Sequence, residues 1–125
     1  MFDHVGLYAS NFERSKAFYG AVLPPLGYDL LEDNQAGERR WLVFGAAPPP
    51  PFFVVAWFPD RSVQPIHFAF SAPSARAVDS FHAAGLAAGG TDNGAPGPRA
   101  TPRPYYAAFL LDPDGNNVEA GFRER

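Results

Sequence analysis

The chain has 125 residues, of which 46% are hydrophobic and 15% aromatic, and its formal net charge is −3. This length and apolar content suit one domain with a real hydrophobic core, and they exclude a disordered chain. The absence of cysteine excludes disulfides, thiolate metal sites and a cysteine nucleophile. The basic residues, nearly all arginine, are scattered along the sequence, so nucleic acid is not an expected partner.

The sequence also carries no sign of a membrane or a targeting segment. No apolar run is long enough for a transmembrane helix, and the N-terminus enters an alternating segment directly, without a basic region before an apolar stretch. We therefore expect a soluble cytoplasmic protein with no membrane partner.

The first half of the chain predicts a strand, a helix and three further strands. Residues 2–9 alternate like a half-buried strand, and Ser10 with Glu13 forms a capping box that predicts the start of a helix. Two prolines are expected to end this helix after Leu23. Turn-forming segments then separate three predicted strands, at about 27–33, 39–45 and 52–58.

The second half repeats this order. Residues 65–72 predict a strand, and Pro73 is typical of the first turn of a helix, which is expected to end before Gly89. A weak strand is predicted near 90–94, followed by a long loop over 94–104. A hairpin ends the chain, with strands over 105–111 and 116–122 joined by a type I turn at Asp112-Pro113-Asp114-Gly115.

The two halves match each other as an internal repeat. Sliding the chain by 63 positions lays His4 on His67 and Phe18 on Phe81 without a gap. Coincidence between two amphipathic strand–helix units is the alternative, but the shared register of the histidines and phenylalanines favours a repeat. We therefore predict one α+β domain over 1–125, with module one at about 1–62 and module two at about 63–125.

Three residues form the one plausible metal constellation in this sequence. His4 and His67 lie on the first strands of the two modules, and Glu119 lies on the last strand. Two imidazoles and one carboxylate suit Zn²⁺, Ni²⁺, Mn²⁺ or Fe²⁺. The alternative is structural, because a strand histidine is commonly hydrogen-bonded in a core and a strand glutamate commonly faces water. For Glu119, strand alternation decides between a cup and solvent.

Four segments carry a family resemblance, and they span nearly the whole chain: HVGL at 4–7, ERSKAFYGAVLPPLGY at 13–28, PIHFAFSAP at 65–73 and YYAAFLLDPDGNNVEA at 105–120. Together they resemble the glyoxalase/bleomycin-resistance/dioxygenase superfamily, also called vicinal oxygen chelate. The resemblance implies two βαβββ modules with mixed sheets that form a cup, often closed by a homodimer. It also implies that His4, His67 and Glu119 occupy metal-ligand positions.

The sequence departs from this family at positions that carry chemistry. The 63-residue offset maps Glu119 onto Ala56, where glyoxalase-type members use a fourth ligand, so glyoxalase I activity is not expected. Two histidines and one glutamate match the facial triad of extradiol dioxygenases. However, the position of their tyrosine is Phe109 here, and residues 100–102 include no histidine. Ring cleavage therefore lacks its usual proton-transfer groups, and no catalytic acid–base residue is assigned.

Three hypotheses about function follow. The first is a divalent-metal-dependent lyase, isomerase or dioxygenase that acts on an oxygenated small metabolite through a Lewis-acid metal. The second is a metal-free, ligand-sequestering protein of the bleomycin-resistance type, and the third is a structural or regulatory domain with a vestigial cup. Four residues are expected to contact the small-molecule ligand: Phe53, Trp57, Arg103 and Tyr106. His82, on the second helix, is expected to face solvent or a neighbouring module without a catalytic role.

Overall fold

The computed structural model describes residues 2–101 and 103–124 of the chain. Each half of the chain contributes four strands and one α-helix, and a 3₁₀-helix follows the first α-helix. In chain order the elements are β1 (His4–Tyr8), α1 (Phe12–Val22), η1 (Pro24–Leu26), β2 (Asp29–Ala36), β3 (Arg39–Gly45), β4 (Phe52–Trp57), β5 (His67–Ser71), α2 (Ala75–Ala87), β6 (Thr91–Pro98), β7 (Tyr106–Leu111) and β8 (Asn117–Phe122).

The strands form two four-stranded sheets of the same design, in the orders β1-β4-β3-β2 and β5-β8-β7-β6. In each sheet the first strand pairs in parallel with the last strand of its module, and the other neighbours are antiparallel. His4 lies opposite Phe52 in the first sheet, and His67 lies opposite Asn117 in the second. The predicted α+β fold of two βαβββ modules with mixed sheets is therefore confirmed.

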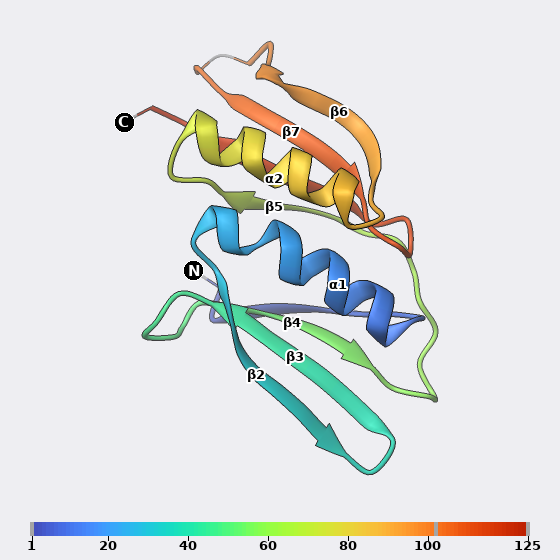
Figure 1. Ribbon diagram of the computed structural model, residues 1–125. Helices are drawn as coiled ribbons and strands as arrows, with labels where there is room; N and C mark the ends of the chain where they lie inside the picture. Colours follow the sequence, from blue (N-terminus) through green and yellow to red (C-terminus); the bar gives the residue numbers. More distant parts are fainter. Residues whose placement is uncertain (1, 102, 125) are drawn as a thin grey trace.

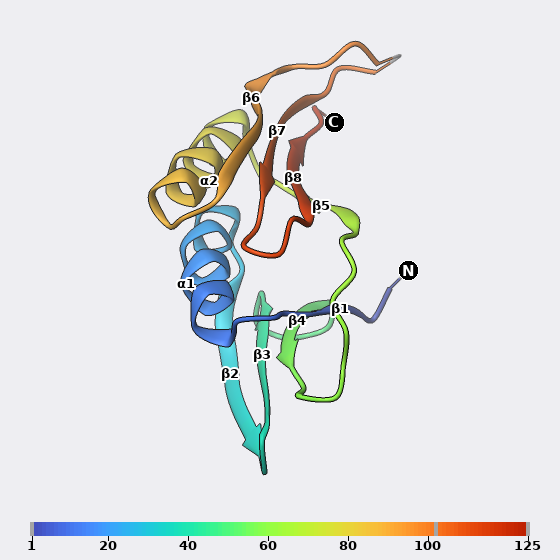
Figure 2. The same cartoon turned by 90° about the vertical axis from the view of Figure 1, so that its right-hand side faces the viewer.

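The two α-helices lie side by side (Figure 1), and both cover the same side of the two sheets (Figure 2). Contacts run between α1 and α2, and between α2 and strands β6 to β8. Within the described part of the chain, no helix covers the opposite side of either sheet. We call this uncovered side of each sheet its cup face.

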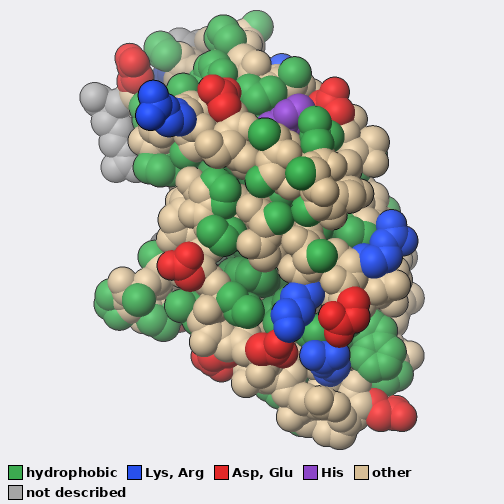
Figure 3. Space-filling model, in the orientation of Figure 1, with side chains coloured by type: hydrophobic (Ala, Val, Ile, Leu, Met, Phe, Trp, Pro, Cys, Tyr) green, Lys and Arg blue, Asp and Glu red, His purple; other side chains and the backbone are tan. Residues whose placement is uncertain are grey.

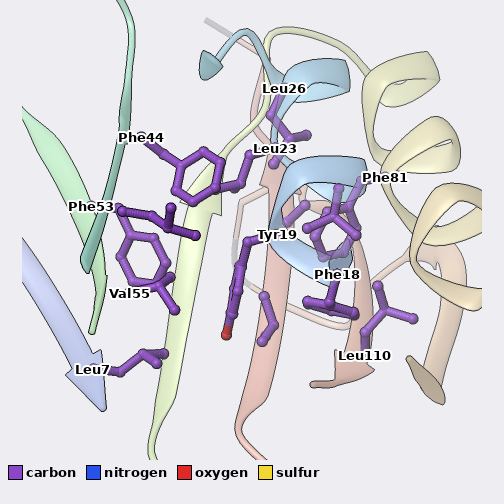
Figure 4. Packing of buried hydrophobic residues seen from close by; sticks show 14 of the residues in the cluster. Leu7, Phe18, Tyr19, Leu23, Leu26, Phe44, Phe53, Val55, Phe81 and Leu110 are labelled. Atoms are coloured by element: carbon purple, nitrogen blue, oxygen red, sulfur yellow. The ribbon is translucent and has the colours of Figure 1, made fainter. Parts of the chain in front are cut away.

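One hydrophobic core joins both modules through the helices. Tyr19 of α1 lies between side chains of the first sheet and those packed around α2 (Figure 4), and its exposed fraction is 0%. Phe18 and Phe81, which the repeat superimposes, are both 0% exposed. Burying an aromatic side chain stabilises the fold by roughly 1.5–3 kcal/mol, so these rings contribute much of the helix packing.

A buried polar network connects α1 to the turn between β7 and β8. The Tyr19 hydroxyl donates to Asp112 Oδ2 over 2.5 Å, and the Asn116 side-chain amide donates to the same oxygen over 2.8 Å. Asp112 Oδ1 accepts from the backbone N–H groups of Asp114 and Asn116. Burial first, and then the Asp112 carboxylate, raises the pKa of Tyr19 well above its usual value. The network therefore keeps a phenol protonated as a donor between the modules.

Both helix starts differ from the sequence prediction. The N-cap of α1 is Asn11, which accepts from the backbone N–H of Arg14 over 3.1 Å, and not Ser10. Ser10 instead donates its backbone N–H to Asp114 over 3.0 Å, a contact with the other module. Pro73 lies before the cap of α2 and not in its first turn, because Ser74 is the N-cap. Asparagine and serine caps are nearly equivalent, so tertiary contacts decide which residue is used.

Two strands are longer than predicted, and both lie at sheet edges. β2 continues to Ala36, through the segment expected to break it, and β6 reaches Pro98, into the expected loop. The pairing of β6 shifts register around Gly94 and Gly97. Edge strands tolerate such bulges and prolines because their outer N–H groups need no partner. The residues that predicted a turn or a loop at these positions therefore belong to irregular edge strands.

His82 is buried, which corrects the expectation that it faces solvent or the other module. His82 is 8% exposed, and its Nε2 lies 2.9 Å from Asp92 Oδ1 on β6. Asp92 also accepts the backbone N–H of Gly94 over 3.0 Å. His82 therefore fixes α2 to the start of β6.

This contact predicts a pH-dependent effect of Asp92→Asn. The Gly94 N–H, and then His82, lower the pKa of Asp92 below its ordinary value. A lowered folded-state pKa gives stability that is present above the ordinary value and is lost as the pH falls through the lowered value. We expect Asp92→Asn to reduce the urea midpoint at neutral pH and to have a smaller effect in acid. Exposed Asp29→Asn is the control, and an equal loss at every pH would contradict the prediction.

The surface gives no sign of a large single-charge patch on the face seen in Figure 3, where acidic and basic side chains are interspersed. Among the described residues, no helix is long and apolar enough to cross a membrane.

Candidate functional site

A histidine and a glutamate meet on the cup face of the second module. Strands β5 and β8 are parallel neighbours, so His67 and Glu119 project from the same side of the sheet. His67 Nε2 lies 3.2 Å from Glu119 Oε2. The Glu119 side chain is 9% exposed and that of His67 is 51% exposed. One end of the pair is therefore buried and the other is open to a ligand.

The partners of His67 determine its tautomer. His67 Nδ1 lies 3.0 Å from the backbone carbonyl of Asn117, and a carbonyl oxygen can only accept. Nδ1 therefore carries the proton, which leaves a lone pair on Nε2 when the ring is neutral. That lone pair faces the Glu119 carboxylate, and two acceptors at this distance repel each other unless a proton or a cation lies between them.

Glu119 is held from its other oxygen. The Tyr105 hydroxyl donates to Glu119 Oε1 over 2.6 Å. Burial, followed by this hydrogen bond and the charge of Glu119, raises the pKa of Tyr105 to about 12. The phenol is thus a proton donor across the physiological range. Gly121 makes this position possible, because a Cβ at Gly121 would overlap the Tyr105 ring.

Aromatic and cationic groups surround the pair. The Phe109 ring lies 6.3 Å from the His67 ring, and the Arg99 guanidinium lies 5.1 Å from the Phe109 centroid. The Arg123 guanidinium lies over the Tyr105 ring at 3.9 Å. These contacts give the cup face positive charge and flat apolar surfaces next to one carboxylate.

A cleft of about 1000 Å³ lies on the other side of Tyr105 from Glu119 and is lined by neither member of the pair. Tyr105 and Arg123 line it, together with Arg103, Ser71 of β5 and Tyr28. Tyr105 also contacts Glu119, so its side chain connects the cleft to the His67–Glu119 pair. The two arginines favour a ligand with anionic or strongly polarised oxygen atoms.

His4 lies on the cup face of the other module. Its Nδ1 is 2.7 Å from Asp3 Oδ1, and its ring stacks on Phe52 with 4.6 Å between centroids. A carboxylate acceptor on Nδ1 leaves Nε2 with the lone pair, as in His67. The His4 side chain is 55% exposed.

The structure unites two of the three predicted metal ligands. Over residues 2–101 and 103–124, no three His, Asp or Glu side chains form a group able to hold a metal ion. One chain therefore brings His67 and Glu119 together and leaves His4 apart, on a separate sheet.

Comparisons with known proteins decide the family. The model of the Glyoxalase/Bleomycin resistance protein/Dioxygenase superfamily matches residues 1–120. The chain belongs to this superfamily. A solved glyoxalase/bleomycin resistance protein from Albidiferax ferrireducens is 32% identical, with 99% of each chain covered and a TM-score of 0.79. A search of curated protein sequences found no match.

More distant structures share the fold alone. A glyoxalase I mutant from Zea mays is 20% identical, with a TM-score of 0.73 over 95% of this chain and 44% of the maize chain. An antibiotic binding protein from a Streptomyces species is 23% identical, with a TM-score of 0.67 over 99% of this chain and 96% of its own. Proteins of this superfamily bind small molecules, and divalent metals are common among them.

The first sheet has an apolar wall at Ala56, the position to which the internal repeat maps Glu119. Ala56 of β4 is 5% exposed and lies opposite Tyr8 and Trp41 in the sheet. The whole of β4, FFVVAW, includes no carboxylate. Phe52 extends this surface toward His4. The first module therefore offers one imidazole and several aromatic rings to a ligand.

The four residues expected to contact a ligand have different positions. Arg103 lines the cleft. Phe53 is 6% exposed in the core, with its ring 5.3 Å from that of Tyr19, and Trp57 packs against the same core. The Tyr106 hydroxyl donates to Asp79 of α2 over 2.6 Å, on the helix side of the sheet. A direct role in binding stays a prediction for all four residues.

The sequence did not predict the hydrogen bond from Tyr105 to Glu119 or the two arginines beside the pair. Tyr105, Arg99 and Arg123 all lie around the pair. The residues predicted to contact a small molecule included Tyr106 in place of Tyr105. Strand alternation could have indicated Tyr105. Phe109 pairs with Glu119, and Tyr105 lies four residues before Phe109, so both side chains point to the same face of the sheet as Glu119.

Proposed function

We propose that this protein binds a small oxygenated molecule together with a divalent metal ion, Zn²⁺, Ni²⁺, Mn²⁺ or Fe²⁺. In this proposal His67 and Glu119 of one chain and His4 of a second copy are the metal ligands. The reaction belongs to the lyase, isomerase or dioxygenase classes, and a bound ion would supply Lewis-acid polarisation of a ligand oxygen.

One observation carries the proposal: each candidate ligand is held from behind by its own partner. Asp3 holds His4, the Asn117 carbonyl holds His67 and Tyr105 holds Glu119. Metal-binding histidines and carboxylates characteristically have such partners, which fix the tautomer and the orientation. Here the free atoms are two imidazole Nε2 atoms and one carboxylate oxygen, a donor set suited to these ions.

The requirement for a second copy follows from the position of His4. Two donors from one chain leave most of the coordination of an ion to water, and His4 lies outside the pair. The cup face around His4 also exposes large apolar side chains, with Phe2 at 66% and Tyr8 at 40% exposure. Exposed apolar surface of this kind favours association, so we propose a homodimer that covers this face.

The residues around the pair have roles in binding rather than in proton transfer. Arg103 and Arg123 attract an anionic oxygen of the ligand into the cleft. Tyr105 keeps Glu119 in place and retains its own proton. The absence of a carboxylate from β4 argues against glyoxalase I chemistry, which uses a second glutamate.

Metal analysis of protein without a polyhistidine tag tests the proposal. We expect near-stoichiometric metal after anaerobic loading, and a loss of at least about tenfold in metal affinity for His4→Ala, His67→Ala and Glu119→Gln. Glu124→Gln is the matched control, since it removes a charge from the cleft beside the pair. Wild-type protein that takes up no metal would contradict the metal site.

A metal-free binding protein is the second candidate. It is favoured by the direct contact of His67 with Glu119, which a proton on Nε2 would satisfy without a metal. It is also consistent with the antibiotic binding protein among the similar structures. In this case Glu119→Gln would leave the metal content unchanged at background level and would alter ligand binding alone.

A further inference from the structure

A second pocket lies beside the cleft and shares Tyr28, Ala69, Phe70 and Ser71 with it. Its volume is about 220 Å³, and it lies where β4 of the first module approaches β5 of the second. Half of the residues that form its wall are aromatic. The lining residues are Val5, Leu23, Tyr28, Phe44, Gly45, Pro51, Phe52, Phe53, Phe68, Ala69, Phe70 and Ser71.

Strand alternation separates the β5 rings of this pocket from the His67–Glu119 pair, although Phe52, which stacks on His4, also lines the pocket. On β5 the side chains of Phe68 and Phe70 pack against the core, whereas His67 projects to the cup face and contacts Glu119. The inference therefore does not depend on a metal ion or on the proposed reaction.

The rings of the pocket have the geometry of a ready aromatic site. The Phe53 centroid lies 5.2 Å from that of Phe68 and 5.1 Å from that of Phe70, with the latter pair perpendicular at 90°. Phe68 and Phe70 are also edge to face, at 5.4 Å and 89°. These spacings are those at which a further ring gains favourable edge-to-face or offset contacts.

The wall is rigid and incompletely covered. Most of its side chains come from strands, which positions them before any ligand arrives. Phe68 and Phe70 remain partly exposed, and Val5 at the rim is 37% exposed. A ligand ring would remove this apolar surface from water, at roughly 25 cal/mol per Å².

The chemistry of the wall selects a neutral ligand. None of the described residues that line the pocket is charged. The polar side chains are Tyr28, whose hydroxyl already donates to the Ser71 carbonyl over 2.8 Å, and Ser71 itself. A charged group would lose its hydration here without an ionic partner. For scale, an apolar cavity of about 150 Å³ holds benzene.

We propose that this pocket binds a neutral, planar compound of one or two fused aromatic rings with a single hydroxyl group. The ring packs on Phe53, Phe68 and Phe70, and the hydroxyl lies at the Ser71 end. This aromatic pocket adjoins the cleft lined by Arg103 and Arg123 and offers an uncharged wall in place of the two arginines.

Titration with 2-naphthol, followed by its fluorescence and by calorimetry, tests the proposal. We expect saturable binding to wild type that falls by at least about tenfold in Val5→Trp, because the indole fills the pocket from its exposed rim. Val5→Ala should retain binding, as should Leu86→Trp, which adds the same ring at an exposed position of α2. The anion 2-naphthoate should bind this pocket more weakly than 2-naphthol.

Several results would overturn the inference. Absence of saturable 2-naphthol binding to wild type would do so, and so would unchanged affinity in Val5→Trp. Loss of binding in Glu119→Gln would place the compound in the cup instead. If wild type fails to bind and Val5→Trp dissociates a dimer in sedimentation, a second copy covers the pocket and the aromatic site is wrong.

Discussion

Asp112→Ala is expected to lower the free energy of unfolding by about 2–5 kcal/mol, measured by equilibrium unfolding in urea. The Asp112 carboxylate accepts from the Tyr19 hydroxyl, from the Asn116 amide and from two backbone N–H groups. Its removal leaves Tyr19 and Asn116 buried without their acceptor, at a cost of about 1–3 kcal/mol for each unsatisfied group.

Tyr19→Phe tests the inter-module bond from Tyr19 to Asp112 separately from the rest of the network. This variant keeps the ring and removes one donor, so we expect a loss of about 1–3 kcal/mol, smaller than that of Asp112→Ala. Equal losses in the two variants would mean that only the Tyr19 bond matters. A negligible loss in Asp112→Ala would contradict the role of the turn in joining the modules.

Gly85→Val is expected to destabilise the fold by about 1–3 kcal/mol, because the position is already closely packed. A Cβ at Gly85 would overlap the Leu110 side chain of β7 and would lie 3.0 Å from Val22 of α1. Gly85 therefore allows α2 to approach both the second sheet and α1. Thermal and urea unfolding with the metal absent measure the change.

Gly20→Ala is the matched control on the other helix. A Cβ at Gly20 meets no atom within 4 Å, and the residue is exposed on α1. Alanine is the better helix former by about 1 kcal/mol, so this substitution is expected to stabilise the protein. If Gly85→Val were as harmless as Gly20→Ala, the close approach of the helices would not be needed.

The repeat made the architecture predictable. The offset of 63 residues places His4 on His67 and Phe18 on Phe81, and the structure builds both halves with the same strand order. The phenylalanines are fully buried in corresponding helices. Hydrophobic periodicity was enough to predict the architecture, because each half must bury the apolar face of one helix against one sheet, however its edge strands are formed.

The face of the sheet to which each strand side chain points was harder to predict. Segment 52–58 reads FFVVAWF, so apolar content cannot tell the core face from the cup face, and Phe53 and Trp57 lie on the core face. Tyr105 and Tyr106 are neighbours with opposite orientations, one toward Glu119 and one toward α2. A shift of one residue along a strand reverses its face, which pattern alone does not determine here.

The sequence predicted the candidate metal ligands but not which of them lie close together in one chain. The parallel pairing of β5 with β8 brings His67 to Glu119, as two modules of this fold imply. Whether His4 joins them depends on how two sheets, or two copies of the chain, face each other. That arrangement is set by loops and exposed surfaces rather than by strand periodicity.

Metal content in mixed dimers of His4→Ala and Glu119→Gln chains tests the central claim most directly. If His4 of one copy completes the site of the other, each mixed dimer contains one site with all three ligands and one site that lacks two. We therefore predict that mixed dimers, separated by differently charged tags, bind about half the wild-type metal, whereas each pure variant binds almost none. Mixed dimers that bind as little metal as the pure variants would contradict a site shared between two chains.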